Sequence, residues 1–260
     1  MYTTDAVLRR GDMKLSQVEE RDIHQVAVPD YPPAAQQTWA TLLARQQRVL
    51  PGRACQAFLD GLQLIAFPPE SIPRLADISD RIEGVTGWRL VRVDGIVPDH
   101  EFFDLLAQRC FPSTDFIRQP EEIGYTPAPD MFHDLLGHAP LLTDARFCAF
   151  FERFGRAGVK AFELNHPARI WLPRIYWYTV EFGLIRESGE MRIYGSGILS
   201  SPDEVLYSLS DKPRKQPFDI AAICSQTYDI WHMQQQLFVI DSFSLLERQF
   251  AQWSAEQGLC

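Results

Sequence analysis

The chain has 260 residues, of which 46% are hydrophobic and 12% aromatic, so it can bury a sizeable core and is not expected to be disordered. Its formal net charge of −9 disfavours a nucleic-acid partner, because phosphate binding draws on clustered lysine and arginine. No apolar run approaches the roughly 18 residues of a membrane span and the N-terminus lacks a signal-peptide core, which predicts a cytoplasmic protein without a membrane partner. Five cysteines without a CxxC pair indicate reduced thiols.

The first half of the chain is predicted to be mainly helical. The polar segment 1–24 is expected to be mobile, and we place one domain at residues 25–260. Residues 33–50, 51–65 and 72–87 have helical patterns bounded by proline or glycine. Residues 88–98 alternate between polar and apolar as in a strand, and helix returns at 99–111.

The second half continues this pattern. Residues 144–160 are amphipathic, and 168–185 are apolar nearly all round, which predicts a buried helix. Residues 191–204 predict a strand, a glycine turn and a helix that begins with the capping box of Ser201 and Glu204. The basic stretch 211–217 predicts a solvated loop, and the chain ends in a helix. The fold class is therefore mainly α with small β elements, in a single domain.

Two histidines lie five residues apart in the sequence PDMFHDLLGH at 129–138. Asp130 suits the N-cap of an α-helix that Gly137 and Pro140 cut short. At ~100° per residue, positions five apart on an ideal α-helix diverge by about 140°, so His133 and His138 do not share a face. They can bind one metal ion only if it lies off the helix end and the last turn is distorted. The alternative is a hydrogen-bonded pair in the core.

Glu181 lies among aromatic and aliphatic residues, where an unpaired carboxylate is costly. Its partner is either Arg174 or Arg186, or a cation that the two histidines already hold. Two imidazoles and one carboxylate form the facial triad of non-haem Fe(II) oxygenases, and the same ligand set binds zinc in hydrolases. The ligand types do not decide between these.

The motifs around these residues resemble one enzyme family. The stretches YTPAPDMFHDLLGHAPLL, IYWYTVEFGLI, IYGSGILSSPDEVLYSLSDKP and LFVIDSF are similar, in the same order, to the catalytic domain of the pterin-dependent aromatic amino acid hydroxylases, above all the bacterial phenylalanine hydroxylases. This resemblance implies a helical basket around Fe(II), with His133, His138 and Glu181 as metal ligands and catalytic residues. It also implies tetrahydrobiopterin or a related tetrahydropterin, together with O2, as cosubstrates.

The resemblance further implies the contacts to substrate and pterin. Arg118 would bind the substrate carboxylate, for which a planar guanidinium is suited, and Trp177 would line the ring pocket. The other substrate contacts would be Thr126, Asp130, Ser200 and Ile230. Phe102 would stack on the pterin, and the other pterin contacts would be Gly95, Val97, Asp99, Asp134 and Tyr176. Animal members carry Glu where Asp134 stands, so a longer or water-bridged contact is expected there. Each side chain also has a structural explanation, such as a surface ion pair for Arg118.

Two residues bear on the choice of substrate. Tryptophan-hydroxylating members tend to have Phe in place of Trp177, and tyrosine-hydroxylating members carry an acidic residue near Ile230. The resemblance thus implies a phenylalanine 4-monooxygenase that makes tyrosine. The alternatives are another aromatic amino acid or ring position (tryptophan 5-, phenylalanine 3-), a zinc hydrolase with the same ligands, and a non-catalytic aromatic-ligand binder. The chain has no room for the regulatory domain and the oligomerisation helix of the animal enzymes, so a monomer is expected.

Overall fold

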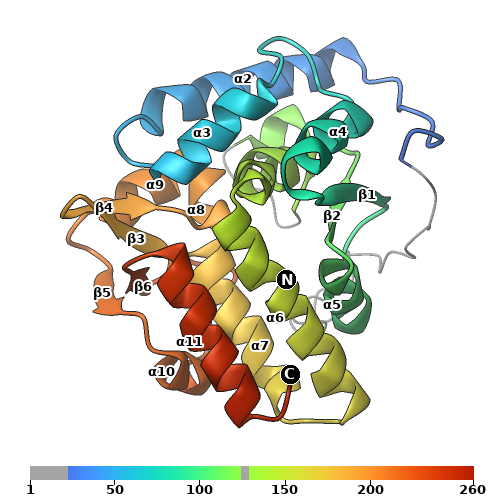
Figure 1. Ribbon diagram of the computed structural model, residues 1–260. Helices are drawn as coiled ribbons and strands as arrows, with labels where there is room; N and C mark the ends of the chain where they lie inside the picture. The colour runs from blue at the N-terminus through green and yellow to red at the C-terminus, as the bar shows by residue number, and fades with distance from the viewer. Residues whose placement is uncertain (1–22, 124–128) are drawn as a thin grey trace.

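The structure, a computed structural model, describes residues 23–123 and 129–260 (Figure 1). The helices are α2 (Pro33–Val49), α3 (Gln56–Ile65), α4 (Leu75–Thr86), α5 (Asp99–Ala107), η1 (Pro120–Glu122), η2 (His133–His138), η3 (Ala139–Thr143), α6 (Ala145–Glu163), α7 (Ala168–Tyr176), η4 (Trp177–Glu181), α8 (Ser196–Leu199), α9 (Pro202–Leu209), α10 (Ile220–Ser225) and α11 (Phe243–Glu256). The strands are β1 (Arg89–Val93), β2 (Cys110–Thr114), β3 (Leu184–Glu187), β4 (Glu190–Ile193), β5 (Arg214–Pro217) and β6 (Gln236–Ile240). The predicted mainly helical class is confirmed.

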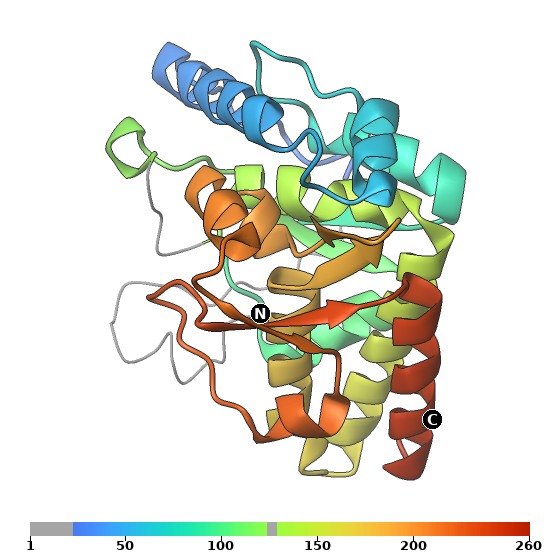
Figure 2. The ribbon, with the colours of Figure 1, turned by 90° about the vertical axis from the view of Figure 1, so that its left-hand side faces the viewer.

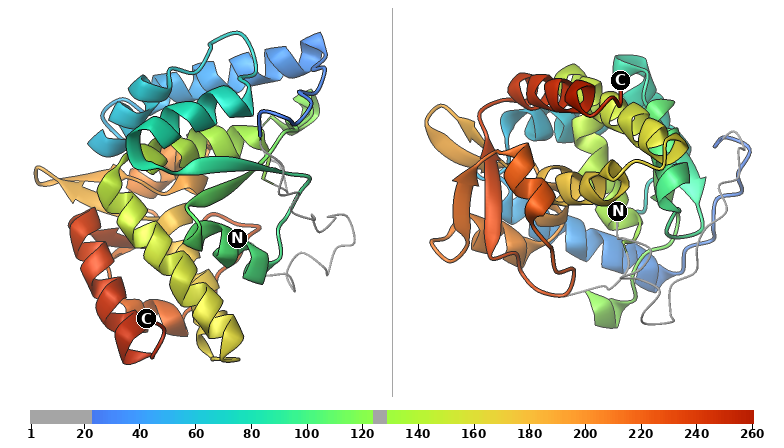
Figure 3. Two further views of the ribbon diagram at one scale, coloured as in Figure 1. Left: turned by 45° about the vertical axis from the view of Figure 1, so that its right-hand side comes forward. Right: turned by 90° about the horizontal axis from the view of Figure 1, so that it is seen from below.

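Three helices, α6, α7 and α11, run side by side below the layer formed by α2, α3 and α4 (Figures 1 and 3). Aromatic side chains on the buried face of α6 join them. The Phe150 ring meets that of Phe250 on α11 edge-on at 5.4 Å, and the Phe154 ring lies 6.0 Å from that of Tyr176 on α7. Such rings bury a large apolar area each, so this contact fixes the end of α7 from which η4 continues.

The β elements form two small sheets. Strands β1 and β2 pair in parallel, with Arg89 opposite Cys110 and Val93 opposite Thr114, and α5 connects them. The second sheet, seen in Figure 2, has the order β4-β3-β6-β5. Both strands of the smaller sheet end beside the cavity that adjoins His133 and His138, so their carboxyl ends supply part of its wall.

Three predicted elements differ from the structure. The helix expected at 99–111 ends at Ala107, because Arg109 adopts a left-handed φ of 59° and Cys110 starts β2. The apolar run 168–185 is helical only to Glu181, and Leu184 begins β3. The loop expected at 211–217 contains β5, an edge strand whose Pro217 is tolerated because its nitrogen need not donate at an edge.

Other expectations are confirmed. The predicted strand contains β1, and the capping-box helix begins where expected, with the Ser201 hydroxyl accepting from the Glu204 amide. All five cysteines are free. In the ranges given above, no helix has the length and apolar character that a membrane crossing requires. The division at residue 25 stays a prediction.

Candidate metal centre

The segment His133–His138 is a π-helix, not the α-helix expected from the sequence. A π-helix closes i→i+5 hydrogen bonds, so its wider turn returns residues five apart to one side, whereas an α-helix separates them. The Nε2 atoms of the two histidines are 3.1 Å apart, and the rings are nearly perpendicular. The expected distortion is therefore present, but it extends over the whole segment and is not confined to the last turn.

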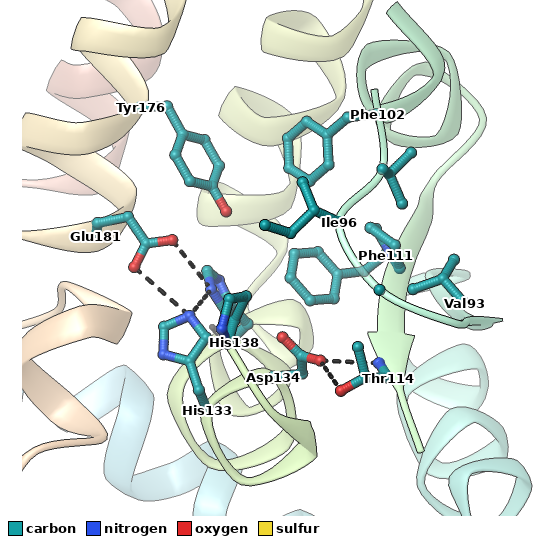
Figure 4. Close-up of a pocket in the computed structure, with 14 residues that line it drawn as sticks. Val93, Ile96, Phe102, Phe111, Thr114, His133, Asp134, His138, Tyr176 and Glu181 are labelled. Atoms are coloured by element: carbon teal, nitrogen blue, oxygen red, sulfur yellow. Dashed lines mark hydrogen bonds and ion pairs between the residues drawn. The ribbon is translucent and has the colours of Figure 1, made fainter. Parts of the chain in front are cut away.

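Glu181 ends a second π-helix, η4, in which the Phe182 amide donates to the Trp177 carbonyl at 2.9 Å. Its Oε1 lies 3.3 Å from His138 Nε2, and its Oε2 lies 3.7 Å from His133 Nε2. Figure 4 shows the three side chains converging from two different elements. The arginine partners considered for Glu181 lie elsewhere, since Arg174 donates to the Cys224 carbonyl and Arg186 is exposed.

These separations fit one metal ion. Nitrogen and oxygen donors about 2.1 Å from a metal, at right angles to one another, lie about 3 Å apart. The observed separations of 3.1, 3.3 and 3.7 Å are close to this value. In the part of the chain that the structure describes, no other group of three His, Cys, Asp or Glu side chains has this proximity.

The surroundings hold the ligands in their metal-binding forms. Ser200 Oγ donates to the Ser196 carbonyl at 2.9 Å and lies 2.9 Å from His133 Nδ1, so the imidazole donates from Nδ1 and keeps a lone pair on Nε2. Burial lowers the pKa of His133 to about 4, so the ring is neutral at pH 7. Burial raises the pKa of the Glu181 carboxyl, but His138 and His133 outweigh it and the net shift is downward. The site thus presents a neutral His133 imidazole and an ionised Glu181 carboxylate beside His138.

The triad forms one wall of a cavity (Figure 4). The lining includes five of the six expected pterin contacts: Gly95, Val97, Phe102, Asp134 and Tyr176. Asp99, the sixth, begins α5 and is absent from the described lining. The Phe102 and Tyr176 rings meet edge-on at 5.4 Å, which makes this end of the cavity aromatic.

The Asp134 carboxyl is fixed at the side of the cavity. Its Oδ2 accepts from both the amide and the hydroxyl of Thr114, at 2.8 and 2.9 Å. Burial raises its pKa to about 7, although the Thr114 hydrogen bonds oppose the shift. The group therefore changes charge near neutral pH.

Arg118 and Asp130 form a buried pair. Arg118 Nε and Nη2 donate to the two carboxylate oxygens at 2.7 and 2.8 Å, and the Arg118 amide donates to Oδ2 at 2.9 Å. The Asp130 side chain is 0% exposed and that of Arg118 8%, so this is not a surface ion pair. Asp130 also accepts from the His133 amide, as expected of a cap. Two of the five guanidinium N–H groups are used here, which leaves three.

The remaining expected substrate residues are dispersed. Trp177 is buried and stacks on Tyr228 at 4.6 Å. Ser200 contacts His133, Ile230 is half-buried, and Thr126 lies outside the described residues. Arg118, Asp130, Trp177, Ser200 and Ile230 are not among the described residues that line the cavity, so their substrate roles stay predictions.

Four residues at the site were not anticipated. Thr114 holds Asp134, the Phe111 ring lies 4.6 Å from that of His138, Tyr228 covers Trp177, and the Ser196 hydroxyl contacts Glu181. Only Ser196 lies in a motif that carried the resemblance, IYGSGILSS. The other three have no local signal, because their roles arise from packing between distant segments.

The chain matches the family model of the biopterin-dependent aromatic amino acid hydroxylases over residues 4–258. It belongs to this family. Membership, together with the buried cluster of three ligands, confirms the expected iron-binding, pterin-dependent oxidoreductase.

Similar proteins agree with this assignment. The chain is 42% identical to a phenylalanine-4-hydroxylase of Pseudomonas aeruginosa over 234 residues, which cover 90% of the chain and 88% of that protein. It is 46% identical to the Chromobacterium violaceum phenylalanine-4-hydroxylase over 210 residues, 80% and 70% of the two chains. The crystal structure of the latter protein with bound Fe(III) has a TM-score of 0.84 and 41% identity, covering 92% of this hydroxylase and 89% of that chain. A further structure of that protein contains iron and phenylalanine and has a TM-score of 0.80 with 42% identity, covering 88% and 84%.

Proposed function

We propose that this hydroxylase converts L-phenylalanine to L-tyrosine, with Fe(II) bound by His133, His138 and Glu181 and a tetrahydropterin and O2 as cosubstrates. The observation that carries the proposal is the three-ligand face beside an aromatic cavity in a chain of this family. The names of the relatives, phenylalanine-4-hydroxylases at 42–46% identity, support phenylalanine as the substrate.

Iron and pterin, when bound, supply the redox chemistry: one oxygen atom of O2 enters the ring, and the other is reduced with two electrons from the pterin. The protein contributes binding and orientation. Phe102 and Tyr176 present aromatic surface suited to a flat heterocycle, and Asp134 offers a fixed carboxyl group at the side of the same cavity. The His138 and Glu181 side chains are 4% and 7% exposed and that of His133 is 12% exposed, which limits the access of bulk water to the reacting centre.

The substrate would be held by the groups next to this cavity. Arg118, oriented by its two bonds to Asp130, keeps three N–H groups with which to bind a carboxylate. The Asp130 carboxylate also accepts from the His133 amide, so the substrate anchor and a metal ligand share one rigid support. The indole of Trp177, which stacks on Tyr228, would form a flat wall of the substrate site that favours a single ring. Because apolar walls discriminate weakly against an added hydroxyl, we expect a preference for phenylalanine and not an absolute restriction.

The test is turnover by the purified, iron-loaded protein. Phenylalanine, a tetrahydropterin and air should give 4-hydroxylated product, and omission of pterin or O2 should abolish it. Tryptophan and tyrosine should be poorer substrates in the same assay. A 3-hydroxylated product, faster turnover of tryptophan, or zinc-dependent hydrolysis without reductant would contradict the proposal. A monomeric state and a cytoplasmic location stay predictions.

A further inference from the structure

Ser196, the first residue of α8, contacts both sides of the metal centre. Its hydroxyl lies 2.9 Å from Glu181 Oε2 and 3.0 Å from the Val180 carbonyl. Its own carbonyl accepts from the Ser200 hydroxyl, which in turn contacts His133 Nδ1. One buried residue, 1% exposed, therefore touches one ligand directly and a second through Ser200.

The position of α8 leaves little freedom to this contact. A Cβ added to Gly137 of η2 would lie 2.9 Å from the Ser196 carbonyl oxygen, and one added to Gly197 would lie 3.1 Å from Glu181 Oε2. The backbone of α8 is thus packed as closely as glycine permits against the segments that carry the ligands. From the other side, Gln46 on α2 donates to the Leu199 carbonyl at 2.5 Å.

The Ser196 hydroxyl has a single hydrogen and two acceptors within reach. A hydrogen bond to a carboxylate is about twice as strong as one to a neutral carbonyl, so the proton goes to Glu181. That bond fixes the rotation of the carboxylate and withdraws electron density from Oε2. Groups that hydrogen-bond to metal ligands set both ligand orientation and metal affinity.

We propose that Ser196 is a positioning residue that orients Glu181 toward the iron and stabilises the ferrous state relative to the ferric state. The inference rests on the proposed binding of iron by the triad. Without the hydroxyl, the carboxylate is free to rotate and becomes a stronger electron donor. The freedom to rotate weakens Fe(II) binding, because the ligand is no longer held in its binding orientation. The stronger donation favours Fe(III) over Fe(II), so the Fe(III)/Fe(II) midpoint potential becomes more negative.

The test compares Ser196→Ala with Ser208→Ala. Ser208 on α9 is also fully buried and its hydroxyl donates to the Val205 carbonyl at 3.2 Å, so the control removes an equivalent group away from the ligands. Fe(II) affinity is measured by competition with a chelator, the potential by redox titration, and folding of the metal-free proteins by circular dichroism. For Ser196→Ala we expect about a 10-fold or greater loss of Fe(II) affinity, a more negative potential and a lower kcat with little change in the phenylalanine KM.

The outcomes are distinguishable. Fe(II) affinity within twofold of wild type, or an unchanged potential, would overturn the role of Ser196 alone. An equal loss in Ser208→Ala would also overturn it, because the effect would then be general destabilisation. A wild-type protein whose triad bound no iron would overturn the proposed function together with this inference. If Ser196→Ala does not fold, Gln46→Met is the second variant. It removes the hydrogen bond to the Leu199 carbonyl of α8 without contacting a ligand, and we expect it to lower the Fe(II) affinity as well. An unchanged affinity would contradict the proposal.

Discussion

Replacement of Arg118 by lysine tests the substrate anchor. In the structure, two guanidinium N–H groups bind Asp130 and three remain. An ammonium group is a point charge, and beside a fully buried Asp130 it must neutralise that carboxylate. Little is then left for a substrate carboxylate. A hydrogen bond to a charged group contributes about 1.5–3 kcal/mol, so Arg118→Lys should raise the phenylalanine KM about 10- to 150-fold.

The assay is tyrosine formation at varied phenylalanine with saturating pterin, together with calorimetric phenylalanine binding. The pterin KM should stay nearly constant, because Arg118 is outside the described lining of the cavity. Arg109→Lys is the control, because Arg109 Nε also lies 2.7 Å from a carboxylate oxygen, here of Glu152. Neither Arg109 nor Glu152 is among the described residues that line the cavity. A phenylalanine KM that moves less than threefold, or that moves equally in the control, would refute Arg118 as the anchor.

Three further predictions concern the metal centre. Glu181→Ala should lower the iron affinity and the turnover rate by more than about 100-fold, while the metal-free protein stays folded. Metal analysis measures the bound iron and circular dichroism the folding. Retained turnover would exclude Glu181 as a ligand. Gly137→Ala should weaken iron binding about 10-fold or more, because its Cβ meets the Ser196 carbonyl at 2.9 Å, whereas Gly84→Ala, with open space around the Cβ, should bind iron normally. Asp134 has a pKa raised to about 7 in the folded protein, whereas in the unfolded chain it ionises at a lower pH, about 4. Its contribution to the free energy of unfolding is therefore full below pH ~4 and is lost as the pH rises to about 7. The measurement is denaturant unfolding of the metal-free proteins. From pH 4 to pH 7, the free energy of unfolding of Asp134→Asn should rise by up to about 4 kcal/mol relative to that of wild type. A difference between the two proteins that does not depend on pH would contradict the pKa shift.

Local signals in the sequence identify most helices and make Glu181 a candidate ligand, whereas the complete donor set is what the family resemblance implies. Proline starts α2, Gly87 ends α4 and Ser201 caps α9, because these residues act on their own backbone. Glu181 was identified from the cost of burying a carboxylate among apolar residues, and its partners are indeed the two histidines.

Other features depend on contacts between distant segments. The angle predicted between His133 and His138 assumed the period of an α-helix. The segment is a π-helix packed against α8, and no residue pattern in the sequence distinguishes a π-helix from an α-helix. Strand β2 follows a left-handed turn at Arg109, where the sequence has no glycine to mark it. The Thr114 contact to Asp134 spans 20 residues, and the Gln46 contact to Leu199 spans 153. Such contacts become visible only once the chain is folded.

The proposed activity depends on a single iron ion bound by His133, His138 and Glu181. The most direct measurement is a crystal structure of the iron-loaded protein with anomalous scattering recorded at the iron edge. We expect one strong peak about 2.0–2.2 Å from both histidine Nε2 atoms and from a Glu181 carboxylate oxygen. An iron peak elsewhere, or an iron-loaded crystal in which these three side chains point apart, would contradict it.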